Sequence, residues 1–237
     1  MMMDVPAVQF ERAGRTFGAV EALHPLELSV PSGRCVGIVG RNGSGKSTLL
    51  QLVAGTLRPS RGAVWIEGHD LSNPAGRDHA RRVVAVGGAI GAFYPDLTVA
   101  EHLQLVAIAH GVADIDAAVE RALTHAGLSS RADALVAQLS TGMRQQLDLG
   151  VARIRPARIL VLDEPDRGLD PGARVRCWTD VADDRAAGRT VLVATHHPDN
   201  LSDLADEVLL LEDGEVVAHG DLAEVRRSAA AARLGLR

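Results

Sequence analysis

Aromatic side chains are scarce in this sequence. Only 3% of its 237 residues are Phe, Trp or Tyr, whereas 46% are hydrophobic. A core must therefore be built mainly from Val, Leu, Ile and Ala. Charged residues make up 23%, and this balance of apolar and charged residues is typical of a folded protein and excludes a disordered one.

Long apolar runs and an excess of positive charge are also absent. No apolar run reaches the roughly 18 residues needed to cross a bilayer, and the start, MMMDVPAVQF, lacks the basic and apolar regions of a secretory signal. A role at a membrane would therefore require a partner. The formal net charge of -5 argues against a sequence-independent nucleic-acid binder, so no nucleic-acid partner is expected.

Cysteine is rare as well. Cys35 lies in the apolar run CVGIVG and Cys177 lies in a predicted helix, far away along the chain. We predict that each is a buried free thiol. This use of cysteine favours a cytoplasmic location.

The hydrophobic pattern divides the chain into an α/β core and a helical insertion. Short strands separated by turns, and a helix that starts at Lys46, are predicted before about residue 90. Helical periodicity then dominates, and apolar runs typical of parallel strands return after Pro156. We predict one domain over residues 1–237, with a core lobe of about 1–90 and 156–237 and a helical subdomain of about 91–155.

The last part of the chain carries two further signals. The segment EVLLLEDGEVVAHG predicts a hairpin that turns at Asp213-Gly214. The Ala- and Arg-rich tail after Asp221 predicts a terminal helix.

A glycine-rich segment, GRNGSGKST, has the spacing G-x-x-x-x-G-K-S/T between a predicted strand and a predicted helix. Its glycines let backbone N–H groups converge on phosphate oxygens, and the helix N-terminus adds partial positive charge. Lys46 would reach the β- and γ-phosphates, and the Ser47 hydroxyl would bind Mg²⁺. The loop alone predicts a nucleoside triphosphate, a ligand shared by kinases, GTPases and motors. The residues predicted to contact the nucleotide are Gly40, Asn42, Gly43, Ser44, Gly45, Lys46, Ser47 and Thr48.

Two adjacent acids, Asp163 and Glu164, end the apolar run ILVLD and precede Pro165. The carboxyl ends of parallel strands are where ligands of open α/β sheets bind. Asp163 is suited to hold Mg²⁺ through water, and Glu164 to act as general base on the attacking water. A solvated acidic pair at a strand end is the alternative, but the phosphate loop upstream favours the catalytic interpretation.

The segment LSTGM, from Leu139 to Met143, lies between these two motifs and precedes a predicted helix. Taken alone, it is typical of a Ser/Thr helix cap. Together with its neighbours it resembles the signature L-S-G-G-Q of the ATP-binding-cassette (ABC) family, and the resemblance extends over nearly the whole chain. Ser140 and Gly142 match, whereas Thr141 and Met143 differ. In the family, the matching residues bind the γ-phosphate held by the other subunit.

Three more residues are assigned by this resemblance. His196, after the strand TVLVAT, corresponds to a histidine that contacts the γ-phosphate; a capping or surface histidine is the alternative. Asp170 matches a loop that communicates across the dimer, although it is also placed to cap the helix that starts at Pro171. Phe17 occupies the place of an aromatic residue that stacks on adenine, with core packing as the alternative.

One departure from the family pattern concerns metal binding and coupling. The family normally has a Gln at the end of the strand before the helical subdomain, but the stretch RVVAVGGAIGAFYPDLTV contains none. Gly88 or Ala89 falls near the expected position, and a glycine cannot coordinate metal through a side chain. We therefore expect a water or a backbone carbonyl to substitute, with slower hydrolysis or altered coupling as the consequence.

The resemblance implies an α/β fold with a P-loop NTPase core, a peripheral antiparallel β layer and an inserted α-helical subdomain. It implies an ATPase that uses ATP and Mg²⁺, in which Lys46, Glu164 and His196 are catalytic and Ser47 and Asp163 hold the metal. The expected partners are a second copy or a homologous cassette, in a head-to-tail dimer, and a separate transmembrane permease. The chain would then be cytoplasmic and peripheral on the inner face of the cell membrane.

The sequence constrains two properties less: the direction of transport, and whether the protein hydrolyses ATP or only binds it. LSTGM and the short C-terminal segment favour an exporter over an importer. Two alternatives stay open: a regulatory cassette that binds ATP with little hydrolysis, and a soluble non-transport cassette that acts on ribosomes or DNA.

Overall fold

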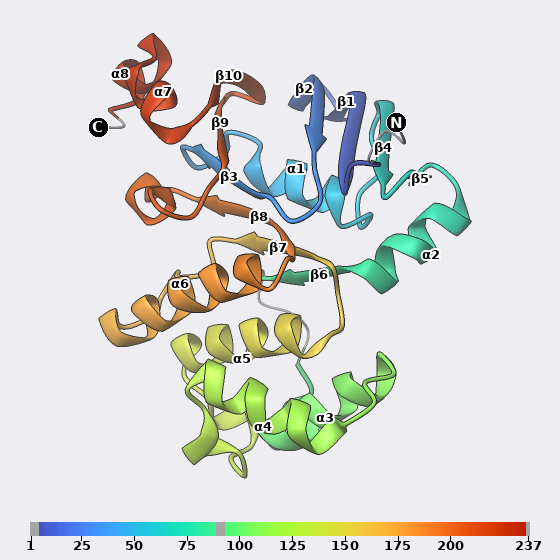
Figure 1. Ribbon diagram of the computed structural model, residues 1–237, viewed down its shortest axis with the longest axis vertical. Helices are drawn as coiled ribbons and strands as arrows, with labels where there is room; N and C mark the ends of the chain where they lie inside the picture. Colours follow the sequence, from blue (N-terminus) through green and yellow to red (C-terminus); the bar gives the residue numbers. More distant parts are fainter. Residues whose placement is uncertain (1–4, 89–92, 236–237) are drawn as a thin grey trace.

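A computed structural model describes residues 5–88 and 93–235 of the chain. Its centre is a six-stranded sheet with the strand order β10-β9-β3-β8-β7-β6, in which only the β9–β10 pair is antiparallel (Figure 1). Every residue of β3 and β8 is buried, as is typical of parallel strands covered on both faces. The strands are β3 (Cys35–Gly40), β6 (Val84–Gly87), β7 (Ile159–Asp163), β8 (Thr190–Thr195), β9 (Glu207–Glu212) and β10 (Glu215–Gly220).

An antiparallel sheet covers one face of this central sheet. Its strand order is β2-β1-β4-β5, and α1 (Lys46–Val53) packs beneath it. One hydrophobic cluster joins this layer, α1 and the central sheet, with Phe10, Leu49 and Ile38 fully buried in it. The antiparallel strands are β1 (Val8–Phe17), β2 (Val20–Val30), β4 (Arg61–Ile66) and β5 (His69–Asp70).

The opposite face is covered mainly by α6 (Pro171–Ala186) and by the C-terminal helices α7 (Leu222–Arg227) and α8 (Ala229–Leu234). Their buried side chains form a second cluster with the other face of β3, β7, β8 and β9. The longest helix of the described part, α6, has 16 residues, and none there is long and apolar enough to span a bilayer.

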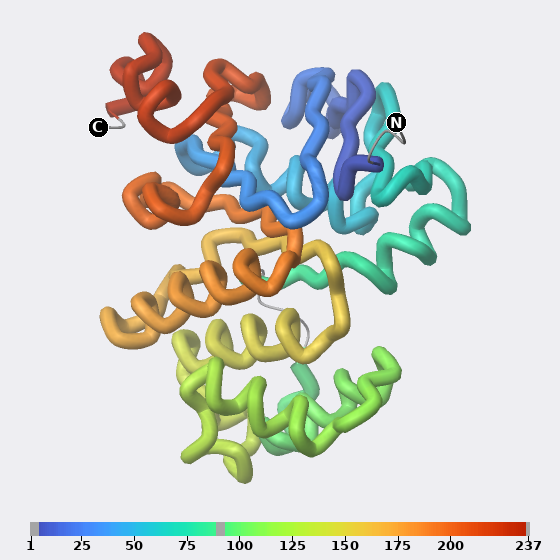
Figure 2. Tube along the Cα trace, in the orientation of Figure 1, coloured from blue at the N-terminus to red at the C-terminus, as the bar shows by residue number. Residues whose placement is uncertain are grey.

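Three helices lie together beyond the β6–β7 edge of the sheet, as Figures 1 and 2 both show. They are α3 (Val99–Ala109), α4 (Ile115–Ala126) and α5 (Thr141–Ile154), and they share a third cluster around Leu103 and Leu147. Local signals start and end them: Thr98 and Glu101 form a capping box on α3, and Gly127 ends α4 with a φ of +65°.

Helix α5 belongs to two of these clusters. Leu147 packs with α3 and α4, whereas Leu149 and Ala152 pack with the central sheet. Because one helix is shared in this way, the division of the chain at about residues 91 and 155 stays a prediction.

Of the local features, the hairpin is confirmed, the single terminal helix is wrong, and one helix was not predicted. The hairpin turns at Asp213 and Gly214, whose φ values are +48° and +83°. The tail after Asp221 is not one helix, because Ser228 takes an extended conformation and caps α8. Helix α2 (Pro74–Val83) was not anticipated, although Asn73 caps it through a 2.8 Å bond from the Gly76 N–H.

Both cysteines are buried and free, as the sequence predicts. Burial raises the pKa of the Cys35 thiol to about 12, and it raises the pKa of the Cys177 thiol to about 12 as well. Both groups are therefore packing residues rather than reactive thiols.

Candidate functional site

The parallel strands bring three distant segments of the chain to one edge of the central sheet. In the register of β3 with β8, Val39 lies opposite Thr195, and in that of β7 with β8, Asp163 lies opposite Ala194. The loops that follow these strands therefore leave the sheet side by side, where ligands of such sheets bind.

A cleft of about 1050 Å³ opens at this edge. Most of the predicted phosphate-loop residues line it, and so do both carboxylates and the histidine after β8. The predicted residues that line the cleft are Asn42, Gly43, Gly45, Lys46, Ser47, Thr48, Asp163, Glu164 and His196.

Lys46 is anchored within the glycine-rich loop. Its ammonium group donates hydrogen bonds to the Gly40 and Arg41 carbonyls, at 2.8 and 3.0 Å, and the residue is only 5% exposed. Burial lowers the pKa of Lys46, while the nearby charges of Glu164 and Asp163 oppose that shift. The charge is thus held at a fixed place in the cleft by carbonyls and carboxylates.

The start of α1 is suited to hold an anion. The helix begins at Lys46, its N-cap is Gly45 with a φ of +103°, and no side chain among the described residues caps it. The first-turn N–H groups therefore lack acceptors within the helix. The Ser44 Oγ is buried and has no hydrogen-bond partner in the described part of the chain. A phosphate group fits this loop, because it would accept hydrogen bonds from these donors.

The adjacent carboxylates Asp163 and Glu164 differ in backbone conformation and in their contacts. Asp163 is the last residue of β7, while Glu164 takes a left-handed φ of +48° and donates its N–H to the Ala194 carbonyl at 2.9 Å. A non-glycine residue in this conformation costs about 1–3 kcal/mol, so the surrounding structure must hold it. The His196 Nδ1 lies 3.4 Å from the Glu164 Oε1. Lys46, Asp163, Glu164 and His196 therefore converge on one cleft.

The cleft also offers ligands for a divalent cation. The Ser47 hydroxyl and the Asp163 carboxylate both line it, and oxygen donors of these two kinds are those that Mg²⁺ prefers. The remaining cleft charges are Arg41, Lys46, Arg167 and Glu164, a mixture suited to a metal-bound polyphosphate.

The predicted signature residues lie at the start of α5. Ser140 is the N-cap, and its Oγ accepts a 3.2 Å hydrogen bond from the Met143 N–H. Gly142 packs closely on the loop after β7, because a Cβ there would lie 2.9 Å from the Gly168 carbonyl oxygen. Thr141 lines the cleft of its own chain, whereas Ser140 and Gly142 are not among the lining residues.

Asp170 and Phe17 lie outside that lining as well. Asp170 caps α6 by accepting a 2.9 Å bond from the Ala173 N–H, and this bond lowers the pKa of its carboxyl. Phe17 ends β1 with 45% of its surface exposed, and the Arg15 guanidinium lies 4.5 Å from its ring centre. This exposure rules out core packing as the reason for an aromatic residue at position 17.

Several lining residues were not predicted from the sequence. Arg41 lies within the glycine-rich segment, Arg167 follows the acidic pair three residues after Glu164, and Thr141 and Gln145 lie one turn apart on α5. Gln145 is 3% exposed, and its Nε2 donates to the Pro165 carbonyl at 3.2 Å. The i, i+4 spacing from Thr141 was the available signal, since it places Gln145 on the same face of the helix.

Gly88, one of the two residues near the position expected for the family glutamine, also lines the cleft. Its φ is +94°, and a Cβ there would lie 2.2 Å from the Asp163 carbonyl oxygen. Its N–H donates to the Asp148 Oδ2 at 2.6 Å, which fixes the strand end against α5. No side chain fits at position 88 without displacing Asp163. The other candidate position, Ala89, lies outside the described residues.

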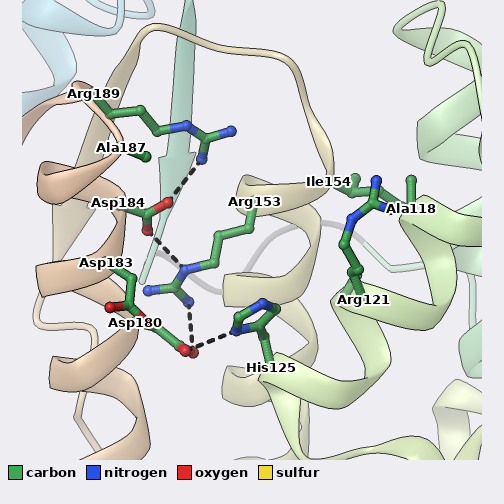
Figure 3. A pocket seen from close by; sticks show the side chains of 11 residues that line it. Ala118, Arg121, His125, Arg153, Ile154, Asp180, Asp183, Asp184, Ala187 and Arg189 are labelled. Carbon is green, nitrogen blue, oxygen red and sulfur yellow. Dashed lines mark hydrogen bonds and ion pairs between the residues drawn. The ribbon is translucent and has the colours of Figure 1, made fainter.

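A second, smaller cavity of about 310 Å³ lies where α4 and α5 face α6. Figure 3 shows Asp180 beside His125 and Arg153, and Asp184 between Arg153 and Arg189. Asp180 pairs with His125 at 2.8 Å, and Asp184 pairs with Arg153 at 2.9 Å and with Arg189 at 3.1 Å. These ion pairs join the helical region to α6, so the cavity has a structural role.

The fold and the large cleft define a P-loop nucleotide-binding protein. A family profile described as ABC transporter matches residues 23–167. The chain belongs to the ABC transporter family, and the resemblance found in its sequence is confirmed.

Two curated relatives are both named as ATP-binding proteins. The chain is 34% identical to Nod factor export ATP-binding protein I of Burkholderia lata, over 92% of this chain and 72% of that protein. It is also 34% identical to the daunorubicin/doxorubicin resistance ATP-binding protein DrrA of Streptomyces peucetius, over 98% of this chain and 71% of that protein. These relatives confirm the predicted function of an ATP-binding subunit of an ABC transporter.

Solved structures confirm the predicted fold class. An ATP-binding subunit of an ABC transporter superposes with a TM-score of 0.83 at 30% identity, over 98% of this chain and 94% of that one. A dimeric ATP-binding cassette bound to ADP and phosphate superposes with a TM-score of 0.82 at 24% identity, over 91% and 98%. The second likeness is one of fold.

The close approach of Gly88 to Asp163 predicts that a side chain at position 88 destabilises the protein. Gly88→Ala is expected to lower the free energy of unfolding by about 2–4 kcal/mol, since backbone strain and a steric clash add. Gly111→Ala is a matched control, because Gly111 also has a positive φ, of +67°. A Cβ added at Gly111 would lie in open space. Urea unfolding of both variants measures the difference, and equal losses would contradict the clash.

Proposed function

We propose that this chain hydrolyses ATP to ADP and phosphate and couples that reaction to export through a separate membrane subunit. The observation that carries the proposal is the convergence of Lys46, Asp163, Glu164 and His196 on one cleft. A site that only bound nucleotide would not need a carboxylate and an imidazole 3.4 Å apart beside the lysine.

Each of these cleft residues has a different role in phosphoryl transfer. Lys46 and the N–H groups at the start of α1 bind and orient the phosphates, and Mg²⁺ on Ser47 and Asp163 would neutralise their negative charge. Glu164 orients the attacking water and accepts its proton. His196, next to Glu164, holds the γ-phosphate. The water is thereby placed in line for attack, which accounts for most of the catalysis in this reaction class.

The signature residues would act on the nucleotide of a second molecule. Ser140 and Gly142 are not among the lining residues of their own cleft, yet they begin a 14-residue helix whose N-terminus carries partial positive charge. A head-to-tail dimer of two copies, or of this chain with a homologous cassette, would place that N-terminus against the γ-phosphate of the facing site. ATP would then hold the two cassettes together.

The family and the names of the relatives support a membrane partner. The relatives are named for Nod factor export and for daunorubicin/doxorubicin resistance. A chain of this class would act at the inner face of the cell membrane, attached to a separate transmembrane permease. Hydrolysis would separate the two cassettes, and that movement would drive the permease.

Replacing the general base tests the reaction. Glu164→Gln is expected to lower ATP turnover by on the order of 10²- to 10⁴-fold while ATP binding is retained, because the amide cannot accept the proton of the attacking water. Phosphate release and equilibrium ATP binding measure the two effects. The matched control is Glu215→Gln, an exposed carboxylate on β10. Substantial turnover that is unchanged in Glu164→Gln would contradict the role of Glu164. If wild type and Glu164→Gln are equally inert and both bind ATP, the regulatory cassette is favoured instead.

Mixing two inactive variants tests the head-to-tail arrangement. Lys46→Ala removes the phosphate contact, and Ser140→Arg blocks the signature, so each variant alone is expected to be inactive. A mixed dimer has one intact site, formed by Lys46 of one copy and Ser140 of the other. Random pairing then predicts about a quarter of wild-type turnover in an equimolar mixture. A mixture as inactive as its components would contradict pairing between copies of this chain.

A further inference from the structure

A buried carboxylate, Asp166, lies two residues after Glu164 in the loop between β7 and α6. The residue is only 3% exposed, although it is surrounded by cleft residues such as Arg167 and Gly168 that face solvent. A carboxylate is costly to bury unless donors satisfy it. Its partners therefore indicate what the burial achieves.

Two side chains from different elements donate to the same oxygen of Asp166. Trp178 Nε1 of α6 lies 3.1 Å from Oδ2, and Asn200 Nδ2 lies 3.2 Å from it. Arg174 adds a positive charge, with its Nε 3.8 Å from Oδ2. The carboxylate is thus a junction between its own loop, the helix α6 and the segment that contains Asn200.

Asn200 belongs to the loop that carries the cleft histidine. It lies in a short 3-10 helix, Pro198–Leu201, that begins two residues after His196, and its N–H donates to the His197 carbonyl at 3.2 Å. The Asp166–Asn200 bond therefore joins the loop of Glu164 to the loop of His196. This hydrogen bond lies outside the lining of the cleft, because neither Asp166 nor Asn200 is a lining residue.

The catalytic loop is held from its other side by α5. Gln145 donates to the Pro165 carbonyl, directly after Glu164. Glu164 itself has the unfavourable φ of +48°, so its conformation depends on contacts made by its neighbours. Asp166 is the neighbour that fixes this loop relative to His196.

We propose that Asp166 is a positioning residue for hydrolysis, whose buried carboxylate sets the Glu164 loop against the His196 loop through Asn200 and Trp178. The proposal rests on the proposed function of the cleft. Asp166 does not touch the nucleotide in this account. Its effect is on the alignment of Glu164 with His196, and small misplacements of catalytic groups lower rates strongly.

The expected signature is a loss of turnover without a loss of binding. Asp166→Ala is expected to lower kcat about 10- to 100-fold, while KM and the ATP dissociation constant stay within about threefold. The reason is that the phosphate loop lies between β3 and α1 and is not part of the loop that contains Asp166. Asp166→Asn keeps an oxygen that accepts from Trp178 and Asn200, and it is expected to recover most of the lost kcat. Asp203→Ala, an exposed aspartate close to Asn200 in the sequence, is the control.

A spectroscopic measurement tests the same link without any turnover. The ring resonances of His196 in NMR spectra are expected to shift in Asp166→Ala and to stay in place in Asp203→Ala. If Asp166→Ala does not fold, Trp178→Phe removes one donor and is expected to produce smaller changes in the same direction.

The results of these experiments distinguish the positioning role of Asp166 from the proposed ATP hydrolysis. Unchanged kcat and unchanged His196 resonances in Asp166→Ala would overturn the positioning role, and so would a parallel loss of ATP binding that Asp166→Asn does not restore. An inactive wild type overturns the proposed function instead, and the His196 resonances then still decide whether Asp166 joins the two loops.

Discussion

The parallel pairing of β8 with both β3 and β7 is the constraint on which the site depends. It brings the ends of three strands to one edge of the sheet, although the phosphate loop and His196 are separated by most of the chain. The pairing is itself stabilised by burial on both faces, since β3 and β8 have no exposed residue. Parallel strands need such cover, and the antiparallel layer and α6 provide it.

The catalytic loop after β7 is held from three directions. The Ala194 carbonyl accepts from the Glu164 N–H, Gln145 donates to the Pro165 carbonyl, and Gly88 packs on the Asp163 carbonyl. The last contact leaves no room for a glutamine side chain at position 88, because the backbone of Asp163 occupies that space. It also connects the strand end to α5 through Asp148, so the signature helix and the carboxylate pair are parts of one packed unit.

Much of the fold and of the site was predictable from the sequence, because the sequence signals for these parts are local. The glycine spacing around Lys46, the apolar run before Asp163 and the capping residues of α3 and α4 each depend on neighbouring residues only. The bond of Gln145 to Pro165 and that of Asn200 to Asp166 could not be assigned in this way, since the bonded residues are distant in the chain. The break at Ser228 was missed because an Ala-rich tail predicts helix regardless of where a serine caps it. The roles of the site residues stay predictions until they are tested.

A crystal structure of the Glu164→Gln chain with ATP and Mg²⁺ tests the central claim most directly. The account predicts two copies with ATP between them, its phosphates on Lys46 of one copy and its γ-phosphate beside Ser140 of the other. It also predicts the metal between Ser47 and Asp163. ATP bound outside this cleft, or held in it by residues of one copy alone in a structure of the dimer, would contradict the account.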